Sequence, residues 1–230
     1  MSPSVWAIPV TMVKNEELVM RAILKPLVEV FPLVVVGDTG STDRTAEICK
    51  EYPKVKVVEY GPLTMDKVGK VRQWLAGYVK KAGYQYAWMV DGDELYHAEA
   101  MEFILKQGPI AGMTMGFTQF VSVDVDDNGK FWLMGDVYSR TSIYHVDDRW
   151  SGVYPFESPA CMAENGGRWK YYPIDNPSER NWHGYHLHRL VRSPLDGDVH
   201  LRVQKRYQFC MRDNDNVKRT HPVDLSAWGL

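Results

Sequence analysis

The sequence predicts an α/β protein in which a mostly parallel sheet is flanked by helices and is followed by an antiparallel and irregular C-terminal part. Short apolar, β-branched runs alternate with helical patterns through the first half of the chain, and their connections are short. After Gly108 the pattern changes to two longer strand-like segments. The chain has 230 residues, so we expect a single domain with one half at 1–108 and the other at 109–230.

The elements of the first half follow from local patterns. Buried strands are predicted at 5–12, 33–36, 55–59 and 86–90. Helices are predicted to begin near Leu18, Arg44 and Lys67, where apolar residues recur at helical spacing. The first helix should bend or end near Pro26, because proline lacks a backbone N–H and crowds the preceding turn.

The second half has a different pattern of predicted elements. Strands are predicted at 113–125 and 131–144, joined by a hairpin turn at 126–129. Residues 150–182 are rich in proline, glycine and aromatic residues without a period, which predicts irregular structure suited to covering an active site. A final helix is predicted at 199–211.

The composition argues against several classes of protein. The formal net charge of -2 and the pI of about 6.4 disfavour a chain devoted wholly to nucleic acid. The cysteines form no CxxC pair, which fits a reducing compartment. No apolar run approaches the roughly 20 residues of a membrane helix, and no leader sequence opens the chain. We therefore expect no membrane insertion and a cytoplasmic protein.

The sharpest feature is Asp91-Gly92-Asp93, directly after a predicted strand. Ligands of doubly wound parallel sheets bind outside the carboxyl ends of the strands. Hard cations such as Mg²⁺ and Mn²⁺ take carboxylate oxygens, substrate phosphate oxygens and water as ligands. An isolated Asp-x-Asp is more often a solvated turn, but its place at a strand end favours a site for a diphosphate and its cation.

The loop at 37–43 is the second candidate for a binding loop. It follows another predicted strand and places Asp38 beyond the strand end. Asp38 is suited to accept hydrogen bonds from a base or a ribose, and the alternative is an ordinary Asx turn before a helix. Its position in a βα unit that precedes the Asp-x-Asp strand favours binding.

Three motifs occur in order: VKNEE at 13–17, VGDTGSTDRT at 36–45 and WMVDGDE at 88–94. Together they resemble the family 2 glycosyltransferases, and most closely the bacterial and phage branch that reads roughly MIVKNEE, VDTGSTDRT and LDADE. The resemblance covers residues 5–97, and the second half matches loosely. It implies a GT-A fold, a nucleotide-diphosphate sugar as donor, with UDP as the most frequent nucleotide, and a divalent cation, Mn²⁺ or Mg²⁺.

The resemblance also assigns roles to matching residues. The residues that would hold the nucleotide are Thr11, Glu16 or Glu17, Asp38, Arg72 and Asp91. Asp38 would face the base and Asp91 the ribose, while Asp93 would bind the cation. Arg72 matches the arginine of the family's ARN motif, and the alternative for it is a solvated helix face. Gly92 stands where alanine is usual, so the donor preference stays open.

The second half must supply a catalytic base. In this branch an arginine and a glycine precede a VHE sequence, and Arg140, Gly152 and Glu157 resemble that pattern without its histidine. Glu157 is therefore the first candidate for the base. Asp148 is the second, because the pair Asp147-Asp148 resembles the ED pair of other family 2 enzymes. The alternative for both is an acidic surface turn.

Three histidines lie close together in the sequence, at His183, His186 and His188. A neutral imidazole can bind a metal through one nitrogen while its other N–H donates to a neighbouring group. His183 resembles the HxGY histidine of this branch, whereas His186 and His188 have the spacing of residues on one face of a strand. All three are candidate cation ligands, and a zinc site is disfavoured because no cysteine pair accompanies them.

The stretch from 180 to 219 is basic, with nine Lys or Arg against four Asp. A solvated terminal helix would explain it. The two functional interpretations are a clamp for the leaving diphosphate, which we favour, and a surface for an anionic acceptor such as nucleic acid.

These inferences predict a metal-dependent glycosyltransferase of the EC 2.4 hexosyltransferase type, and the resemblance implies inversion. The acceptor hydroxyl is not identified, so a modified DNA base, a protein and a glycan stay open. Two other classes compete. A nucleotidyltransferase would carry a glycine-rich, basic loop after its first strand, where 13–17 is acidic and lacks glycine. A non-catalytic sugar- or nucleic-acid-binding module would not need the two acidic motifs.

Overall fold

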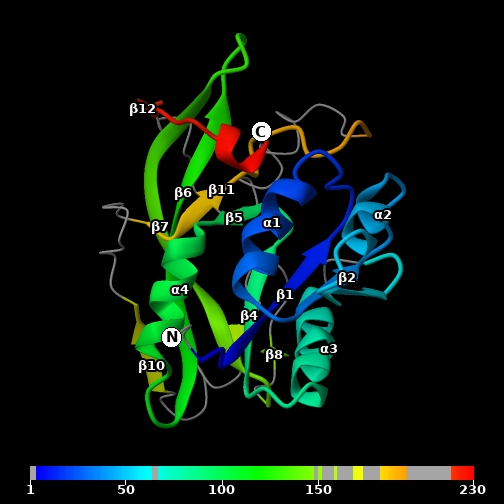
Figure 1. Cartoon of the computed structure of the whole chain (residues 1–230), viewed down its shortest axis with the longest axis vertical. Helices are drawn as coiled ribbons and strands as arrows, with labels where there is room; N and C mark the ends of the chain where they lie inside the picture. Colours follow the sequence, from blue (N-terminus) through cyan, green and yellow to red (C-terminus); the bar gives the residue numbers. More distant parts are fainter. Residues whose placement is uncertain are drawn as a thin grey trace.

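The computed structural model describes residues 4–63, 67–147, 150–151, 158–159, 168–172, 182–195 and 219–230. In this part of the chain a ten-stranded sheet runs through the molecule and carries helices on both faces (Figure 1). The predicted α/β fold with a flanked, largely parallel sheet is confirmed.

Four parallel strands form the first half of the sheet. They are β1 (Ala7–Val13), β2 (Val34–Asp38), β3 (Val55–Glu59) and β4 (Tyr86–Asp91), in the order β3-β2-β1-β4. In the ladders of β1, Val13 lies opposite Asp38 and Met12 lies opposite Asp91. The carboxyl ends of β1, β2 and β4 therefore meet at one edge, which brings the predicted binding loops together.

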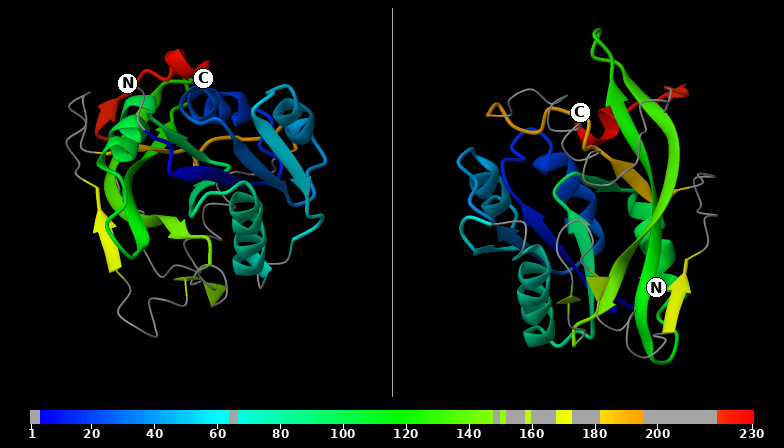
Figure 2. Two further views of the ribbon diagram at one scale, coloured as in Figure 1. Left: turned by 60° about the horizontal axis from the view of Figure 1, so that its bottom comes forward. Right: turned by 180° about the vertical axis from the view of Figure 1, so that it is seen from behind.

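Helices cover both faces of this sheet. Three of them pack on one face and one packs on the other: α1 (Met20–Val30), α2 (Thr45–Lys50) and α4 (Ala98–Gln107) against α3 (Val68–Lys81). Figure 2 shows the sheet between α3 and the other helices. Fully buried Trp88 and Leu75 mark the two cores, one on each face.

The first helix is predicted to bend or end near Pro26, and in the structure it continues through Pro26 to Val30. Leu27 is 1% exposed and Phe31 is fully buried, so the residues beyond the proline pack into the core. Their burial outweighs the backbone hydrogen bond that the proline cannot donate. Of the two predicted outcomes, an end at Pro26 is therefore wrong.

The second half of the sheet is mostly antiparallel. β6 (Met113–Val125) and β7 (Phe131–His145) form the predicted long hairpin, and β7 joins the first half beside β4. The tip of the hairpin projects beyond the rest of the sheet (Figure 1). A short strand, β11 (Gly184–His186), lies between β6 and β5 (Glu94–Tyr96) and pairs with both.

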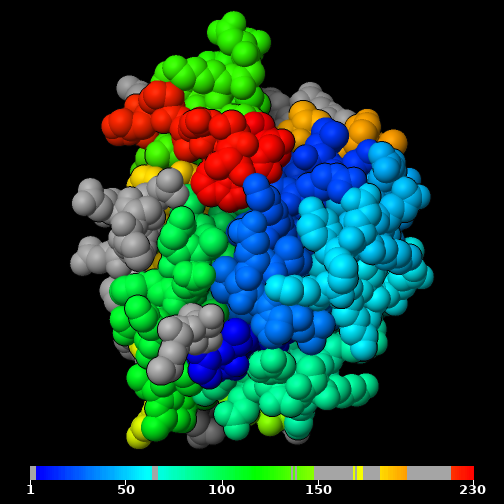
Figure 3. Space-filling view, in the orientation of Figure 1, coloured from blue at the N-terminus to red at the C-terminus, as the bar shows by residue number. Residues whose placement is uncertain are grey.

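The remaining described strands are short. β10 (Arg168–Tyr171) pairs with β6, β12 (His221–Pro222) with β7, and β8 (Trp150–Ser151) with β9 (Ser158–Pro159). The C-terminal segment then crosses from the hairpin to α1 and ends with a short helix, η2 (Ser226–Trp228) (Figure 3). The predicted helix at 199–211 and most of the predicted cover at 150–182 lie outside the described residues. None of the described helices is long and apolar enough to cross a membrane.

Candidate active site

Asp91 and Asp93 follow one another at the end of β4, but their side chains join two separate clusters. The Asp91 cluster consists of Asp91, Arg72, Glu94 and Arg140, and the Asp93 cluster of Asp93, Glu16, His186, His188 and Arg192. Gly92 lies between them. A Cβ at Gly92 would lie 3.0 Å from Glu16 Cγ and 3.2 Å from the carbonyl oxygen of Met12. Glycine at this position thus lets the loop after β1 approach Asp93.

The Asp91 cluster is assembled from β4, α3 and β7. Arg72 Nη2 lies 3.3 Å from both carboxylate oxygens of Asp91, and Arg140 Nη1 lies 2.9 Å from Asp91 Oδ2. Arg140 also forms an ion pair with Glu94, whose other oxygen accepts a hydrogen bond from the backbone N–H of Asp91 at 3.1 Å. Arg72 is 9% exposed, so the alternative that it lies on a solvated helix face is wrong.

The two carboxyl groups of this cluster are shifted in opposite directions. Burial raises the pKa of Asp91, but the guanidinium groups of Arg140 and Arg72 outweigh burial and lower that pKa to about 2. Burial raises the pKa of Glu94 to about 8; Arg140 opposes this rise, while the charges of Asp91 and Asp93 add to it. Asp91 is therefore the ionised member of the cluster at neutral pH, and Glu94 is the member that takes up a proton first.

Asp93 is the centre of the second cluster, and its side chain is only 7% exposed. Its Oδ2 atom lies 3.4 Å from His186 Nε2 and 2.8 Å from Arg192 Nη1. The same Arg192 nitrogen lies 2.8 Å from Glu16 Oε1. The N–H of Leu187 donates to the carbonyl oxygen of Asp93 at 2.7 Å, which fixes the segment after β11 against the Asp93 loop.

The three predicted histidines occupy different positions. His186 ends β11 beside Asp93, and the ring centre of His188 lies 4.2 Å from that of His186. His183 is fully buried, and its Nδ1 accepts a hydrogen bond from the N–H of Gln119 on β6 at 2.9 Å. Because Nδ1 accepts, the hydrogen bond assigns the imidazole proton to Nε2. The structure thus brings His186 to Asp93 and His188 to His186, and it ties His183 to β6.

The loops after β1 and β2 are joined to each other and to the segment after β11. Asp43 is the main link, because its Oδ2 atom accepts hydrogen bonds from the N–H of Glu17 at 3.2 Å and from Ser193 Oγ at 2.6 Å. Thr45 Oγ1 accepts a hydrogen bond from the N–H of Glu16 at 2.7 Å. These bonds hold Glu16 in the position where it meets Arg192.

Asp38 and Thr11 belong to neither cluster. Asp38 is 7% exposed, and its Oδ1 atom accepts a hydrogen bond from the N–H of Ser41 at 2.9 Å, as in the turn considered as its alternative. Thr11 lies inside β1 with no exposed surface, and no described residue offers its hydroxyl group a hydrogen-bond partner. Both residues lie near the carboxyl edge of the sheet, Asp38 at the end of β2 and Thr11 two residues before the end of β1.

The family model described as glycosyl transferase family 2 matches residues 10–164. The chain belongs to glycosyl transferase family 2. The match contains Glu16, Asp91, Asp93 and Arg140, whereas His186, His188 and Arg192 lie beyond it. No curated protein shows a significant match to the chain.

Several solved structures are similar to this family 2 chain in fold. A 4-diphosphocytidyl-2C-methyl-D-erythritol synthase is 16% identical, with a TM-score of 0.44 over 61% of this chain and 75% of that one. Glucosyl-3-phosphoglycerate synthase from Mycobacterium tuberculosis, in complex with phosphoglyceric acid, is 19% identical, with a TM-score of 0.36 over 50% of this chain and 43% of that one. HddC from Yersinia pseudotuberculosis is 10% identical, with a TM-score of 0.42 over 73% of this chain and 90% of that one. The family 2 chain thus spans less than half of the mycobacterial synthase.

Asp93 and His186 are the residues of the Asp93 cluster that could hold a hard divalent cation. Two ligands at about 2.1 Å on neighbouring octahedral positions lie about 3 Å apart, and Asp93 Oδ2 and His186 Nε2 are 3.4 Å apart. Within the described ranges, no three His, Cys, Asp or Glu side chains are arranged to hold a metal ion by themselves. Such a site suits a cation whose other ligands are substrate phosphates and water.

Sequence reasoning missed three charged residues of this family 2 site. It named Arg140, Glu94 and Arg192 within motifs or in the basic stretch, but gave none of them an individual role. For Arg140 and Arg192 the signal is present only in three dimensions, since they reach Asp91 and Asp93 from distant segments. Glu94 lies in the same motif as both aspartates, so its place in the motif was the signal. The predicted bases Glu157 and Asp148 lie outside the described residues.

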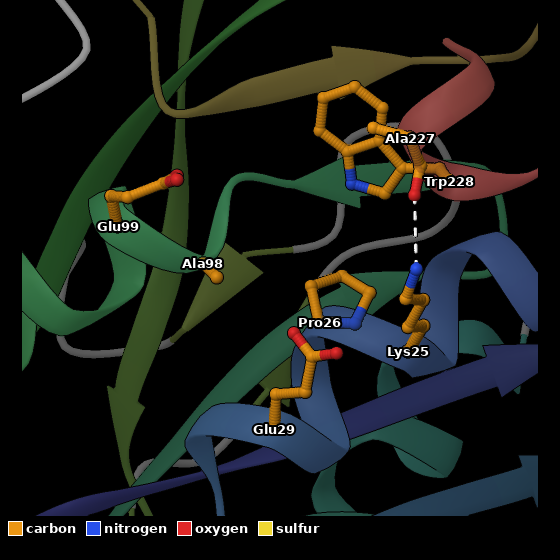
Figure 4. Close-up of a pocket in the computed structure, with 7 residues that line it drawn as sticks. All are labelled: Lys25, Pro26, Glu29, Ala98, Glu99, Ala227 and Trp228. Carbon is orange, nitrogen blue, oxygen red and sulfur yellow. Dashed lines mark hydrogen bonds between the residues drawn. The ribbon is translucent and has the colours of Figure 1, made fainter.

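A separate surface groove lies between α1, α4 and η2 (Figure 4). It is lined by Lys25, Pro26, Glu29, Ala98, Glu99, Ala227 and Trp228. Lys25 Nζ donates a hydrogen bond to the carbonyl oxygen of Ala227 at 3.1 Å across one end of it. None of the residues that line this groove belongs to the Asp91 or Asp93 cluster, so the groove is not part of the candidate active site.

Proposed function

We propose that this chain is a metal-dependent, inverting glycosyltransferase that transfers a sugar from a UDP-sugar to a hydroxyl group. The proposal rests on the pairing of Asp93 with His186 at the carboxyl end of β4, beside an Asp91 carboxylate that two arginines hold. Membership of glycosyl transferase family 2 supports the reaction class.

In this proposal the loops after the parallel strands hold the nucleotide. Asp38 accepts hydrogen bonds from the base. Asp91 accepts them from ribose hydroxyls, because Arg72 and Arg140 keep its carboxylate ionised and oriented. Thr11 and Glu16 are proposed neighbours of the nucleotide on the strength of their motif positions.

The chemistry requires a place for the charge that forms on the leaving diphosphate when the anomeric C–O bond breaks. A divalent cation, Mn²⁺ or Mg²⁺, would neutralise that charge when held by Asp93 and His186, with His188 as a further candidate ligand. His183 is also a predicted ligand, but its Nδ1 accepts the N–H of Gln119 and its Nε2 carries the proton, so its ring offers a cation no lone pair. Arg192, from the basic stretch that we favour as a clamp, is suited to bind the same diphosphate.

The acceptor hydroxyl must lose its proton as it attacks. Glu157 is the first proposed base and Asp148 the second, because a carboxylate on the far side of the sugar can take that proton. Attack from the side opposite the leaving group inverts the anomeric centre in one displacement. The proposed acceptors are a modified DNA base, a protein or a glycan, each of which offers a hydroxyl group.

The test is a binding screen of UDP, GDP, dTDP and CDP, each with and without Mn²⁺, by thermal shift and calorimetry. We expect UDP with Mn²⁺ to stabilise the protein, since a ligand at a hundred times its Kd adds about 2.7 kcal/mol to the free energy of unfolding. Asp93→Asn should abolish the effect of Mn²⁺. Asp127→Asn, the same change at an exposed hairpin position, should retain it.

The outcomes separate the competing classes. A lack of response to all four nucleotides would overturn the transferase proposal in favour of a binding module. If UDP stabilises the wild type equally with and without Mn²⁺, the metal is no longer part of the proposal. A positive result leads to an assay of UDP release from UDP-glucose, with hydroxylated DNA, proteins and glycans offered as acceptors.

A further inference from the structure

One guanidinium group bridges the two buried carboxylates of the Asp93 cluster. Arg192 Nη1 lies 2.8 Å from Asp93 Oδ2 and 2.8 Å from Glu16 Oε1. The three side chains are 16%, 7% and 6% exposed, so these charges are largely removed from water. In such surroundings the two carboxylates need a positive partner.

This guanidinium contacts the same Asp93 oxygen that the proposed cation would bind. Asp93 Oδ2 is the atom that faces His186 Nε2, and it is also the atom that Arg192 contacts. An oxygen that binds a divalent cation at about 2.1 Å cannot keep a second positive group at full strength, because the two cations repel each other. Arg192 and the cation therefore compete for Asp93.

Arg192 and the residue that follows it are both anchored, so a movement of the Arg192 side chain is enough for the exchange. The carbonyl oxygen of Arg192 accepts a hydrogen bond from the N–H of Leu18 at 2.8 Å. The next residue, Ser193, donates to Asp43 at 2.6 Å. The guanidinium thus stays beside the site whichever anion it contacts, and a diphosphate offers it two or more oxygens in a geometry that arginine prefers.

We propose that Arg192 is a built-in counter-ion that competes with the divalent cation for Asp93 and transfers to the diphosphate when the donor binds. This inference rests on the proposed function. Its consequence is an order of events: the cation binds weakly to the protein alone and tightly together with the donor, whose diphosphate draws the guanidinium away from Asp93.

The test measures Mn²⁺ binding to the protein without nucleotide, by calorimetry and by the electron-spin resonance signal of free Mn²⁺. Arg192→Gln should bind Mn²⁺ at least about tenfold more tightly than the wild type, because the positive charge that competes with Mn²⁺ for Asp93 is gone. A tenfold change in affinity is the size expected for one charge contact. The same variant should bind UDP in the presence of Mn²⁺ about tenfold more weakly. An arginine that serves only as a structural link predicts Mn²⁺ binding that is unchanged or weaker in the variant.

Two further variants and one measurement control for a loss of folding. Arg21→Gln removes an arginine from an exposed ion pair with Glu51 and should leave both affinities unchanged. Arg192→Lys keeps the charge but not the two-sided contact, so its Mn²⁺ affinity should rise by about threefold. If Arg192→Gln has a lower melting temperature than the wild type, Mn²⁺ alone should raise that temperature again. Mn²⁺ should raise the melting temperature of the wild type by less.

The results distinguish this inference from the proposed function. If the wild type binds UDP with Mn²⁺ but Mn²⁺ affinity is the same in wild type, Arg192→Gln and Arg192→Lys, the counter-ion role is wrong and the transferase proposal stands. If the wild type and both variants bind neither Mn²⁺ nor UDP, both are wrong.

Discussion

The two aspartates of the Asp-x-Asp motif show how neighbouring residues can be given different surroundings. Asp91 is held by Arg72 and Arg140, which come from a helix and a long strand of the central sheet. Asp93 contacts His186 and Arg192, which come from a short strand and the segment that follows it. The partners of Asp91 therefore belong to the central framework, whereas those of Asp93 belong to a segment near the C-terminal end of the chain.

The difference indicates that the motif combines a carboxylate whose partners stay the same, Asp91, with one whose partners can change, Asp93. We call them the fixed and the exchangeable carboxylate. The two arginines lower the pKa of Asp91 to about 2, so this group keeps its charge at any ordinary pH. Among the described residues, Asp93 contacts the imidazole of His186 and the guanidinium of Arg192, and in our proposal a cation takes the place of the guanidinium. The following changes test this contrast, from the largest expected effect to the smallest.

The largest effect is expected on activity at the exchangeable carboxylate. Asp93→Asn should lower kcat/KM for UDP release from the donor by about 10³-fold, because a neutral amide is a poor ligand for a hard cation and the leaving charge is left unbalanced. Steady-state release of UDP measures it, with Asp127→Asn as the control. Activity within a few-fold of the wild type would contradict a role of Asp93 in the reaction.

The fixed carboxylate should instead control stability. Arg140→Met leaves Asp91 and Glu94 with one positive partner fewer in a buried setting, which should cost about 3 kcal/mol or more. In a domain of this size the melting temperature should fall by roughly 6–12 °C. Arg21→Met, at an exposed pair, should cost under about 1 kcal/mol. Equal losses in the two variants would contradict the assignment of Arg140 to the framework.

A third change tests how β11 positions the Asp93 cluster. A Cβ at Gly184 would lie 2.5 Å from the carbonyl oxygen of Leu95, so Gly184→Ala must separate β11 from β5. We expect a loss of about 1–3 kcal/mol, typical of overpacking, together with weaker Mn²⁺-dependent UDP binding. Gly77→Ala on α3 is the control, because its Cβ meets nothing within 4 Å. Denaturant unfolding measures the stability and calorimetry the UDP binding. If Gly184→Ala changed neither, the close contact between β11 and β5 would be disproved.

The smallest effect is expected at the link between the loops, and it depends on pH. Burial raises the pKa of Asp43, but hydrogen bonds from Ser193, from the Thr45 hydroxyl and N–H, and from Glu17 lower it below its ordinary value. A lowered folded-state pKa means that the ionised group stabilises the fold above the unfolded value of about 3.9 and that this contribution is lost as the pH falls through the folded-state pKa. Asp43→Asn should therefore cost about 1 kcal/mol at pH 6 and progressively less below pH of about 3.9. Melting curves of both proteins from acid to neutral pH measure the difference, which should not grow in acid.

Much of the fold is predictable because its signals are local. The parallel strands and α3 were predicted within one or two residues, since each is a continuous apolar run or a helical pattern. α4 was overlooked, although Ala100, Met101, Ile104 and Leu105 are buried at helical spacing. β5 has three residues and exists only because β11 pairs with it, so no local pattern could identify it.

The site was predictable to the extent that its residues belong to sequential motifs. The motif at 88–94 predicted that Asp91 and Asp93 lie at a strand end, and the structure places them there. The partners of these aspartates come from 49 and 99 positions further along, at Arg140 and Arg192. Pairing across such distances is decided by the register of β7 on β4 and of β11 on β6, which a single sequence does not specify.

The insertion of β11 between β5 and β6 sets a limit on how the chain can be shortened. A fragment that stopped at residue 164, where the family match ends, would lack the strand that joins β5 to β6. Both would expose unpaired backbone edges, which favour aggregation. During synthesis on the ribosome, β5 and β6 are made before β11, so their two edges stay unpaired until Gly184–His186 has left the ribosomal tunnel. The pairing of β11 then joins the two strands and brings His186 to Asp93.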